Sequence, residues 1–223
     1  MIGATMLLAG ALACQPPETL PRPRIDGPTQ AQPRRALPIG SYTLSLIWTP
    51  EQCRRGDGNA EDIDCRAARG FVLHGLWPDG EGRDWPQYCR PAAVLPERTL
   101  KAHWCATPSA QLLQHEWAKH GTCMPGYTPD RYFATAGRLL RGLRAPAMVR
   151  LARRDHLTVG QFSAAYIAAN RLPAGSVRLN VNQRGWLREV WVCLDTRFRA
   201  RRCPAHQGGA APGRRLRIEL PSA

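Results

Sequence analysis

The chain has 223 residues, a length that fits one domain of ordinary core size, with or without a tail, and excludes an array of several domains. It is strongly basic, with 31 Lys and Arg residues against 17 Asp and Glu residues, which suits a polyanionic partner such as nucleic acid. Only Lys101 and Lys119 are lysines, however, so the charge comes almost entirely from Arg and fits a GC-rich codon bias as well as phosphate binding. The charge permits a nucleic-acid partner but does not establish one.

Residues 1–13 are apolar and uncharged, are too short to span a bilayer, and end in the small-x-small sequence Ala11-Leu12-Ala13. Although they lack a basic beginning, we interpret them as a secretory signal peptide and expect a secreted or periplasmic protein with no membrane span. Cys14 leaves a lipid anchor as the second alternative, because a lipobox usually has Leu where this chain has Ala11.

Residues 15–38 are rich in Pro, Arg, Gln and Thr and nearly free of large apolar side chains. Such a composition buries too little apolar surface to order a chain. We therefore expect residues 14–39 to be a disordered Pro/Arg-rich arm, most simply a tether, and residues 40–223 to form one folded domain.

Two apolar segments near the start of this domain have the alternation expected of strands. The first, residues 42–48, is ended by Thr49-Pro50. The second, residues 71–76, is followed by Trp77-Pro78-Asp79-Gly80, which predicts a turn. Alternation in the second strand places three side chains on one face: Val72, His74 and Leu76.

His74 has two interpretations. A histidine near the end of an apolar strand is by default a core residue with satisfied hydrogen bonds. Here Gly75 follows, which allows close approach of the backbone, and Trp77 and Asp79 come next, as in a pocket that stacks a base. The strand alone supports both interpretations equally.

Residues 115–123, His-Glu-Trp-Ala-Lys-His-Gly-Thr-Cys, place two imidazoles, a carboxylate and an ammonium within six positions. We expect a helix here, with Thr107 as N-cap, Pro108 at the first helical position and Gly121 as its end. The helical period separates two neighbouring faces, one with Leu113 and Trp117 and the other with Leu112, Glu116 and His120.

The spacing of these histidines does not fit a metal site. A zinc-binding helix places two histidines four residues apart, so that both rings reach one ion. Four residues after His115 stands Lys119, and His120 comes one residue later, about 140° around the helix from His115. We therefore expect no metal and no cofactor. The motif therefore indicates acid–base chemistry on an anion, in which the histidines exchange protons and Glu116 and Lys119 adjust the local electric field. Such chemistry requires a second catalytic group on the other side of the anion.

The remaining elements follow the same periodicities. Helices are expected over residues 128–143, with Pro129 in the first turn, and over residues 158–169, which open with the capping box Thr158 and Gln161. Strands are expected over three segments: residues 177–181, 186–194 and 216–220. The sequence contains no internal repeat and no Gly-rich nucleotide-binding loop.

Eight cysteines in an exported chain indicate disulfide bonds, because oxidising compartments preserve them. No Cys-x-x-Cys pair is present, so a zinc ribbon is not expected. Cys53 and Cys65 bracket a polar loop that a local disulfide would close, and Cys193 and Cys203 flank an Arg-rich loop. If Cys14 is cleaved off or lipidated, seven cysteines remain and one is left over.

Two segments together carry a family resemblance. Phe71-Val72-Leu73-His74-Gly75-Leu76-Trp77-Pro78 and residues 115–123 are similar, in sequence, order and separation, to the two signature motifs of the ribonuclease T2 family. The resemblance extends more loosely over residues 41–220, including Glu189 and Cys193 on a late strand. It implies a disulfide-bonded α+β fold, with a central antiparallel sheet flanked by helices, and a secreted or periplasmic, metal-free endoribonuclease whose catalytic domain is residues 40–223.

The functional residues of the family carry over onto this sequence. The resemblance implies that His120 is the base toward the 2′-hydroxyl and His74 the acid toward the 5′-oxygen, so that single-stranded RNA is cleaved to 2′,3′-cyclic phosphate and then 3′-phosphate ends. His115 would help to hold the phosphate, and Glu116 and Lys119 would support the charged transition state. For the base, the resemblance implies three side chains: Trp77 and Trp85 for stacking and Asp79 for recognition.

The resemblance also implies three disulfides, Cys53–Cys65, Cys89–Cys123 and Cys193–Cys203, and leaves Cys105 unassigned. We expect a monomer that acts on RNA. Three competing functions are a metal-dependent hydrolase, a catalytically silent RNA-binding relative and a cationic structural protein. The histidine spacing disfavours the first, and the presence of every polar catalytic residue type disfavours the second.

Overall fold

The structure is a computed structural model that describes residues 14–55, 63–67 and 70–221. The expected signal peptide, residues 1–13, lies outside these ranges, as do residues 56–62 of the polar loop that begins at Cys53. Within the described ranges, no helix is both long and apolar enough to cross a bilayer.

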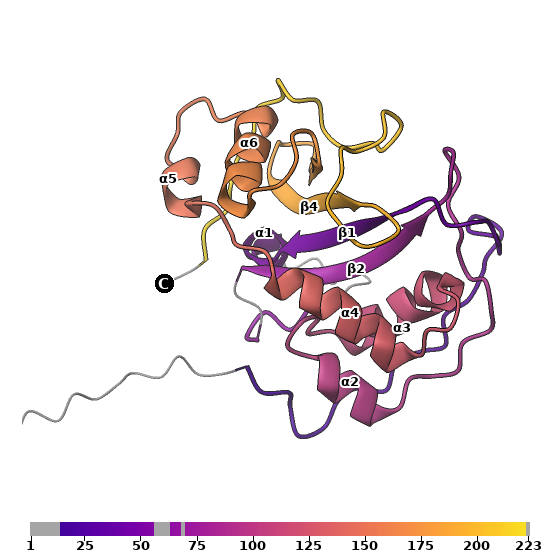
Figure 1. Cartoon of the computed structure of the whole chain (residues 1–223). Helices are drawn as coiled ribbons and strands as arrows, with labels where there is room; N and C mark the ends of the chain where they lie inside the picture. Colours follow the sequence, from indigo (N-terminus) through magenta and orange to yellow (C-terminus); the bar gives the residue numbers. More distant parts are fainter. Residues whose placement is uncertain (1–13, 56–62, 68–69, 222–223) are drawn as a thin grey trace, which may run out of the picture.

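A four-stranded antiparallel sheet forms the centre of the fold, in the order β2-β1-β4-β3 (Figure 1). The strands are β1 (Ser41–Trp48), β2 (Phe71–Asp79), β3 (Val177–Val181) and β4 (Leu187–Leu194). The sequence predicts all four, and β1, between β2 and β4, is buried along its whole length. The turn predicted over residues 77–80 is wrong, because β2 continues to Asp79; β2 is an edge strand, where Pro78 is tolerated.

The strand predicted over residues 216–220 does not form. Leu216 and Ile218 are buried in the core, as their alternation suggests. The backbone of this region, however, is joined to the rest of the fold by isolated bridges, from Arg217 to Trp186 and from Arg215 to Thr158. The alternation of apolar and polar residues in this segment therefore reflects side-chain packing, and the backbone does not form a continuous hydrogen-bonded ladder.

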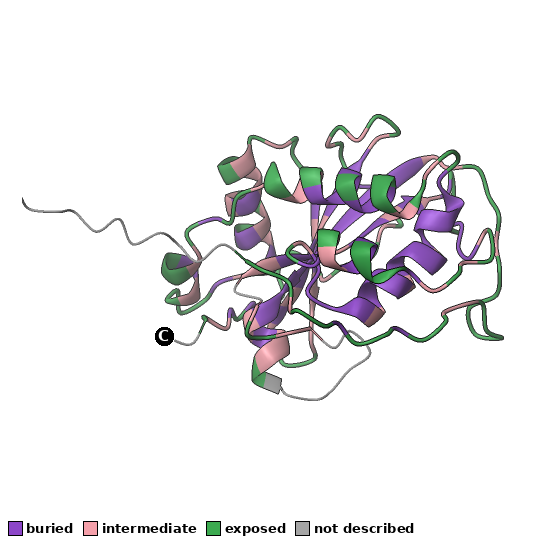
Figure 2. Cartoon of the chain, turned by 90° about the horizontal axis from the view of Figure 1, so that it is seen from below, coloured by how far each residue is buried: buried purple, intermediate pink, exposed green. Residues whose placement is uncertain are grey.

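The helices pack against the sheet in two groups. One group lies beside β1 and β2 and consists of α2 (Glu97–His103), α3 (Ala110–Lys119) and α4 (Pro129–Arg141) (Figure 1). The others are α1 (Thr49–Arg55), which follows β1 directly, α5 (Met148–Ala152) and α6 (Val159–Asn170), which packs against β3. Figure 2 shows that buried residues concentrate on the sheet and on the helix sides that face it.

Side-chain caps begin α4 and α6, and the sequence predicts the one at α6. The Thr128 hydroxyl accepts a hydrogen bond from the backbone N–H of Arg131, and Thr158 and Gln161 form the predicted capping box. The apolar pattern of the sequence does not predict α1, α2 or α5. These helices have seven, seven and five residues, too few to show a helical apolar period.

β2 contains a bulge at His74, where its register on β1 shifts by one residue. Leu73 and Leu76, on either side of the bulge, both enter the main core, whereas Val72 belongs to a smaller cluster. The prediction that Val72, His74 and Leu76 share one face is therefore wrong. A bulge inserts one residue into the two-residue alternation and re-aims the side chain at that point.

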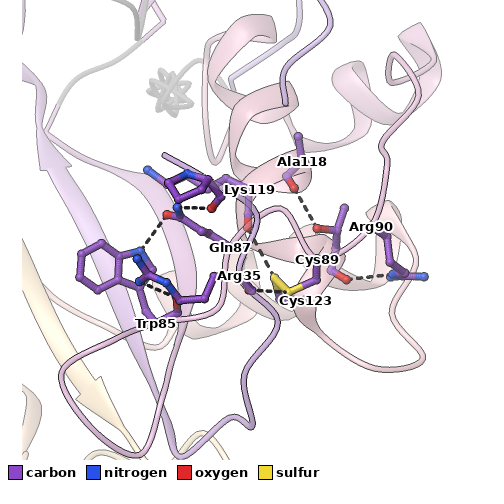
Figure 3. The surroundings of a disulfide bond; sticks show 10 residues. Arg35, Trp85, Gln87, Cys89, Arg90, Ala118, Lys119 and Cys123 are labelled. Atoms are coloured by element: carbon purple, nitrogen blue, oxygen red, sulfur yellow. Dashed lines mark hydrogen bonds between the residues drawn. A yellow bond between two sulfur atoms is a disulfide. The ribbon is translucent and has the colours of Figure 1, made fainter. Parts of the chain in front are cut away.

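The arm of residues 14–39 is extended but is not the disordered tether that its composition predicts. Leu20 and Pro23 are buried, and Leu20 belongs to the main core cluster. The backbones of Arg35 and Gln87 exchange two hydrogen bonds, at 2.9 and 2.8 Å, next to the disulfide shown in Figure 3. The composition describes the average residue of the arm. A few apolar contacts and backbone hydrogen bonds are nevertheless enough to hold the arm against the rest of the fold. The folded domain accordingly includes residues before Gly40.

Four disulfides cross-link the described residues. Three are the pairs that the resemblance implies: Cys53–Cys65, Cys89–Cys123 and Cys193–Cys203. The fourth joins Cys14 to the previously unassigned Cys105, so it ties the start of the arm to the chain just after α2. This bond uses the sulfur of Cys14 and is therefore incompatible with a lipid anchor on that residue.

Full reduction is expected to lower the melting temperature by more than about 10 °C. The bonds span sequence separations from 10 to 91 residues. Each bond lowers the conformational entropy of the unfolded chain. This stabilises the folded state by about 3 kcal/mol for a short loop and by between about 4 and 5 kcal/mol for the longest. Thermal melts with and without reductant measure the effect, and the paired change Cys14→Ser with Cys105→Ser isolates the bond to the arm. A melting temperature that reduction leaves unchanged would contradict the cross-links.

Candidate active site

The helix α3 carries the charged motif, and its N-terminus is tied to the sheet. Its N-cap is Ser109, whose hydroxyl accepts a hydrogen bond from a backbone N–H of the first turn at 3.1 Å. The prediction of Thr107 as N-cap is wrong, because its hydroxyl instead donates to the carbonyl of Leu73 on β2 at 2.9 Å. The helix ends at Lys119, and Gly121 opens the short 3₁₀ helix η1 (Gly121–Cys123). The motif is thereby brought against the bulge of β2.

His74 lies between two carboxylates from different elements. Its Nδ1 is 2.7 Å from Oε1 of Glu189 on β4, and its Nε2 is 3.4 Å from Oε1 of Glu116 on α3. The other oxygen of Glu189 accepts hydrogen bonds from Asn180 at 3.1 Å and Trp191 at 2.8 Å. Burial acts to raise the pKa of Glu189, but these hydrogen bonds and the charge of His74 lower it overall. An ionised Glu189 favours a protonated His74, the form that a general acid requires.

Glu116 is the most enclosed group of the site, with 1% of its surface exposed. Its Oε2 accepts a hydrogen bond from the indole N–H of Trp77 at 2.8 Å. Burial raises the pKa of Glu116, and the neighbouring charges of His74, His115 and Lys119 only partly offset this. Glu116 therefore bonds Trp77 to α3, and its other oxygen lies next to His74.

His120, the C-cap residue of α3, packs its ring against Trp77. The two rings are stacked, with 5.6 Å between centroids and 29° between planes, and His74 meets Trp77 edge-on at 5.0 Å. Burial lowers the pKa of His120 well below its ordinary value, and the charges of Lys119, His115 and His74 add to this. Its Nδ1 is buried and has no hydrogen-bond partner among the described residues. The lowered pKa favours the neutral form of His120, which is the form that a general base requires.

The lowered pKa of His120 predicts a change in stability between pH 7 and pH 5. In the unfolded chain this imidazole titrates near its ordinary pKa of 6.5, whereas in the folded chain it stays neutral to lower pH. Below about pH 6.5 the unfolded state binds more protons at His120, so the free energy of unfolding decreases as the pH falls. His120→Phe should lose less stability on acidification than the parent chain. Urea unfolding of both proteins at pH 7 and pH 5 measures this, and equal losses would contradict the shift.

His115 is held by residues from outside α3. Its Nδ1 is 2.7 Å from Oδ2 of Asp26 on the arm, and the Tyr88 hydroxyl donates to the other oxygen of Asp26 at 3.0 Å. The backbone N–H of Tyr88 donates to the carbonyl of Lys119 at 2.8 Å. Burial lowers the pKa of Lys119, although the charges of Glu116 and Asp26 oppose this. The arm and the loop at Tyr88 thus close against the last turn of α3.

A cavity of about 360 Å³ opens beside His120 and Lys119. All three side chains expected to bind a base line this cavity: Trp77, Asp79 and Trp85. Burial raises the pKa of Asp79, against the effect of hydrogen bonds from two hydroxyls of β1 at 2.9 and 3.4 Å. Trp85 is 46% exposed, and the guanidinium of Arg35 lies over its ring, 5.4 Å from the centroid.

Several residues of the site are absent from the set that the sequence predicts: Asp26, Tyr88, Glu189 and Trp191. Glu189 has a sequence signal, because an acid within the apolar residues of β4 has to find a partner when buried. Asp26 has none, since it lies in a segment whose composition predicts disorder.

The assembled groups are suited to proton transfer. His74 is paired with the carboxylate of Glu189, whereas burial and neighbouring positive charges lower the pKa of His120, so the two imidazoles have opposite surroundings. Within the described part of the chain, no three His, Cys, Asp or Glu side chains lie together in a way that could hold a metal ion. The arrangement can remove one proton and deliver another across an anionic group.

Comparison with known proteins identifies the family. Residues 39–203 match the model of the Ribonuclease T2 family. The chain belongs to the ribonuclease T2 family. Its antiparallel sheet, flanking helices and disulfides are accordingly a ribonuclease T2-like α+β fold.

Ribonucleases from bacteria are among the relatives. The chain is 28% identical over 187 residues to a protein named Probable ribonuclease from Haemophilus influenzae. The match covers 74% of this chain and 61% of that protein, so this chain spans less than two thirds of that relative. It is 31% identical over 167 residues to a ribonuclease of Aeromonas hydrophila, covering 69% of this chain and 71% of that one. The solved structure of RNase NT in complex with 5′-AMP has a TM-score of 0.59 at 21% identity, covering 81% of this chain and 98% of that one. The family and these relatives support an endoribonuclease of the ribonuclease T2 type.

Proposed function

We propose that this protein is a metal-independent endoribonuclease that cleaves single-stranded RNA by transphosphorylation from the 2′-hydroxyl. The observation that carries the proposal is the pair of imidazoles on Trp77, with His74 bonded to the buried carboxylate of Glu189 and His120 buried beside Lys119. RNA brings its own nucleophile, so one acid and one base suffice for cleavage. The membership of the ribonuclease T2 family supports the RNA substrate.

The reaction proceeds in two steps. His120 accepts the proton of the 2′-hydroxyl, which attacks the adjacent phosphorus, and His74 donates a proton to the departing 5′-oxygen, leaving a 2′,3′-cyclic phosphate. Water then attacks the cyclic phosphate with the roles reversed: His74 accepts the proton of water and His120 returns one to the 2′-oxygen. The product has a 3′-phosphate end. A positioned acid or base typically contributes a factor of about 10² to 10⁴ in rate.

The other polar groups of α3 act on charge and orientation. His115 and Lys119 bind the non-bridging phosphate oxygens and stabilise the negative charge of the transition state. Glu116 accepts from Trp77 and lies 3.4 Å from His74, so it fixes the orientation of the acid and of the aromatic ring that supports the base.

The cavity beside His120 receives the nucleobase. Trp77 and Trp85 supply stacking faces and Asp79 a hydrogen-bonding carboxyl group. The 5′-AMP held by RNase NT supports a nucleotide as the ligand of this fold.

The four disulfides support export, through residues 1–13 as signal peptide, to the periplasm or the medium, where the enzyme acts as a monomer.

The test is cleavage of a short RNA beside its all-deoxy counterpart, with EDTA present and product ends identified by mass spectrometry. Cyclic phosphate ends from the RNA alone are expected, because only RNA carries the 2′-hydroxyl. Cleavage that requires added metal, or equal cleavage of the DNA, would overturn the two-histidine mechanism. Binding of RNA without cleavage under any condition would identify a silent binder instead.

Two substitutions at Trp77 separate stacking from orientation. Trp77→Ala removes a stacking face worth between about 1 and 3 kcal/mol, so KM should rise by a factor between about 5 and 150. It should also lower kcat, because both histidines and Glu116 contact this side chain. Trp77→Phe keeps a smaller aromatic ring and loses the indole N–H, and we expect a lowered kcat with a smaller change in KM than in Trp77→Ala. An unchanged kcat in Trp77→Phe would show that the bond to Glu116 has no part in orientation.

A further inference from the structure

The N-terminal arm is fastened along the outer side of α2 and α3. The disulfide to Cys105 holds its first described residue, and Lys101 on α2 donates to the carbonyl of Glu18. Further along, the backbone N–H of Arg24 donates to the side chain of Gln111 on α3 at 2.8 Å. In Figure 1 the indigo segment follows this course beneath the helices. These contacts lie before residue 39, where the match to the family model begins.

Asp26 is the residue at which this arm reaches the active site. Its side chain is 17% exposed and uses both oxygens, Oδ2 for Nδ1 of His115 at 2.7 Å and Oδ1 for the Tyr88 hydroxyl at 3.0 Å. Burial acts to raise the pKa of Asp26, but the bonds and charges of His115, Tyr88 and Lys119 lower it overall. Asp26 is therefore a carboxylate with two fixed partners.

This contact determines what His115 can do. A carboxylate at Nδ1 requires a proton on that nitrogen and fixes the plane of the ring, which leaves Nε2 for another partner. When the ring is protonated, Nε2 carries the second N–H and can donate to a phosphate oxygen. Without Asp26, neither the ring plane nor the position of the proton would be fixed by a charged group.

We propose that Asp26, contributed by the N-terminal arm, is a positioning residue that orients His115 toward the phosphate of the RNA substrate. The inference rests on the proposed ribonuclease function and assigns part of that function to a segment outside the family match. The arm is then a component of the active site and not only a tether.

The kinetic test compares Asp26→Ala and Asp26→Asn with Glu18→Gln in the full chain. Glu18→Gln removes one negative charge from an exposed side chain of the same arm, so it controls for the change in net charge. We expect kcat/KM for a short RNA to fall about 10-fold in Asp26→Ala, to fall less in Asp26→Asn, whose amide oxygen can still accept from Nδ1, and to stay unchanged in Glu18→Gln. Melting temperatures identify any loss that comes from unfolding.

A double-mutant cycle with His115→Ala shows whether Asp26 acts through His115. If it does, Asp26→Ala should have little further effect once His115 is absent. An equal loss in the His115→Ala background would indicate a purely structural role and would overturn the inference. So would Asp26→Ala activity within twofold of an active parent chain.

Nitrogen NMR of His115 supplies a readout that does not depend on turnover. In the parent chain we expect the neutral ring to carry its proton on Nδ1, and in Asp26→Ala we expect this proton to shift toward Nε2. A proton on Nε2 in the parent chain would overturn the inference.

The outcomes separate the two proposals. A parent chain that cleaves no RNA refutes the proposed function and with it the role in catalysis, whereas an active parent with an insensitive Asp26 refutes only the inference about the arm.

Discussion

Replacement of His120 by Ala is expected to lower kcat/KM for RNA cleavage by a factor between about 10² and 10⁴, the contribution of one positioned base. The imidazole is buried against Trp77, and burial together with neighbouring positive charges lowers its pKa and favours the neutral form, which the proposed base requires. The other imidazole at Trp77, His74, meets the indole edge-on and is bonded to Glu189, so it does not occupy the position of His120. Initial rates on a short RNA at pH 6, with active-site concentration normalised, measure the loss.

His156→Ala is the matched control. His156 is exposed and lies away from the cavity that His120 lines, so the substitution removes an imidazole without touching the site. Its rate should stay within twofold of the parent chain. Near-normal turnover in His120→Ala would refute the assignment of the base. A similar loss in both variants would show that the effect does not depend on the site, and it would refute the assignment as well.

Gly75→Ala is expected to reduce activity more than 100-fold while lowering the free energy of unfolding by between about 1 and 3 kcal/mol. A Cβ on Gly75 would lie 1.7 Å from Oε2 and 2.5 Å from Cδ of Glu116, and 2.8 Å from Nε1 of Trp77. Glu116 has 1% of its surface exposed, so its carboxylate cannot move aside into solvent. The substitution must therefore break the Trp77 hydrogen bond to Glu116 and displace the groups that orient His74. Steady-state kinetics and urea unfolding on the same preparation separate the two effects.

Gly213→Ala provides the comparison, because nothing lies within 4 Å of a Cβ built at that position. It should leave both kcat/KM and stability nearly unchanged. Combining Gly75→Ala with Glu116→Asp, which withdraws the carboxylate by one methylene, should recover part of the lost stability. Full activity in Gly75→Ala alone would show that Glu116 does not control the orientation of the site.

The features that the sequence predicts correctly are those with local causes. Strand β3 was expected over residues 177–181 and has those bounds, because its apolar alternation lies within five residues. The capping box of α6 is likewise local, since Thr158 and Gln161 are three residues apart. The family motifs are contiguous segments, and they identified the family to which the chain belongs.

The predictions that failed depend on contacts beyond the local window. Thr107 has the residue type and position of an N-cap, but Leu73 on β2 captures its hydroxyl and Ser109 becomes the cap. The arm reads as disordered from composition, yet Leu20 enters the core. In both cases a partner distant in sequence outweighs the local preference.

The amino-acid sequence by itself determined the family, the four strands of the sheet, the helices α4 and α6 and the two motifs that carry His74 and His120, because apolar periodicity, caps and contiguous motifs are properties of neighbouring residues. Only the tertiary structure decided which groups surround those imidazoles. Glu189 lies 115 residues from His74, and Asp26 lies 89 residues from His115. Their contacts exist because a bulge re-aims His74, the sheet order brings β4 alongside β1, and a disulfide holds the arm against the helices.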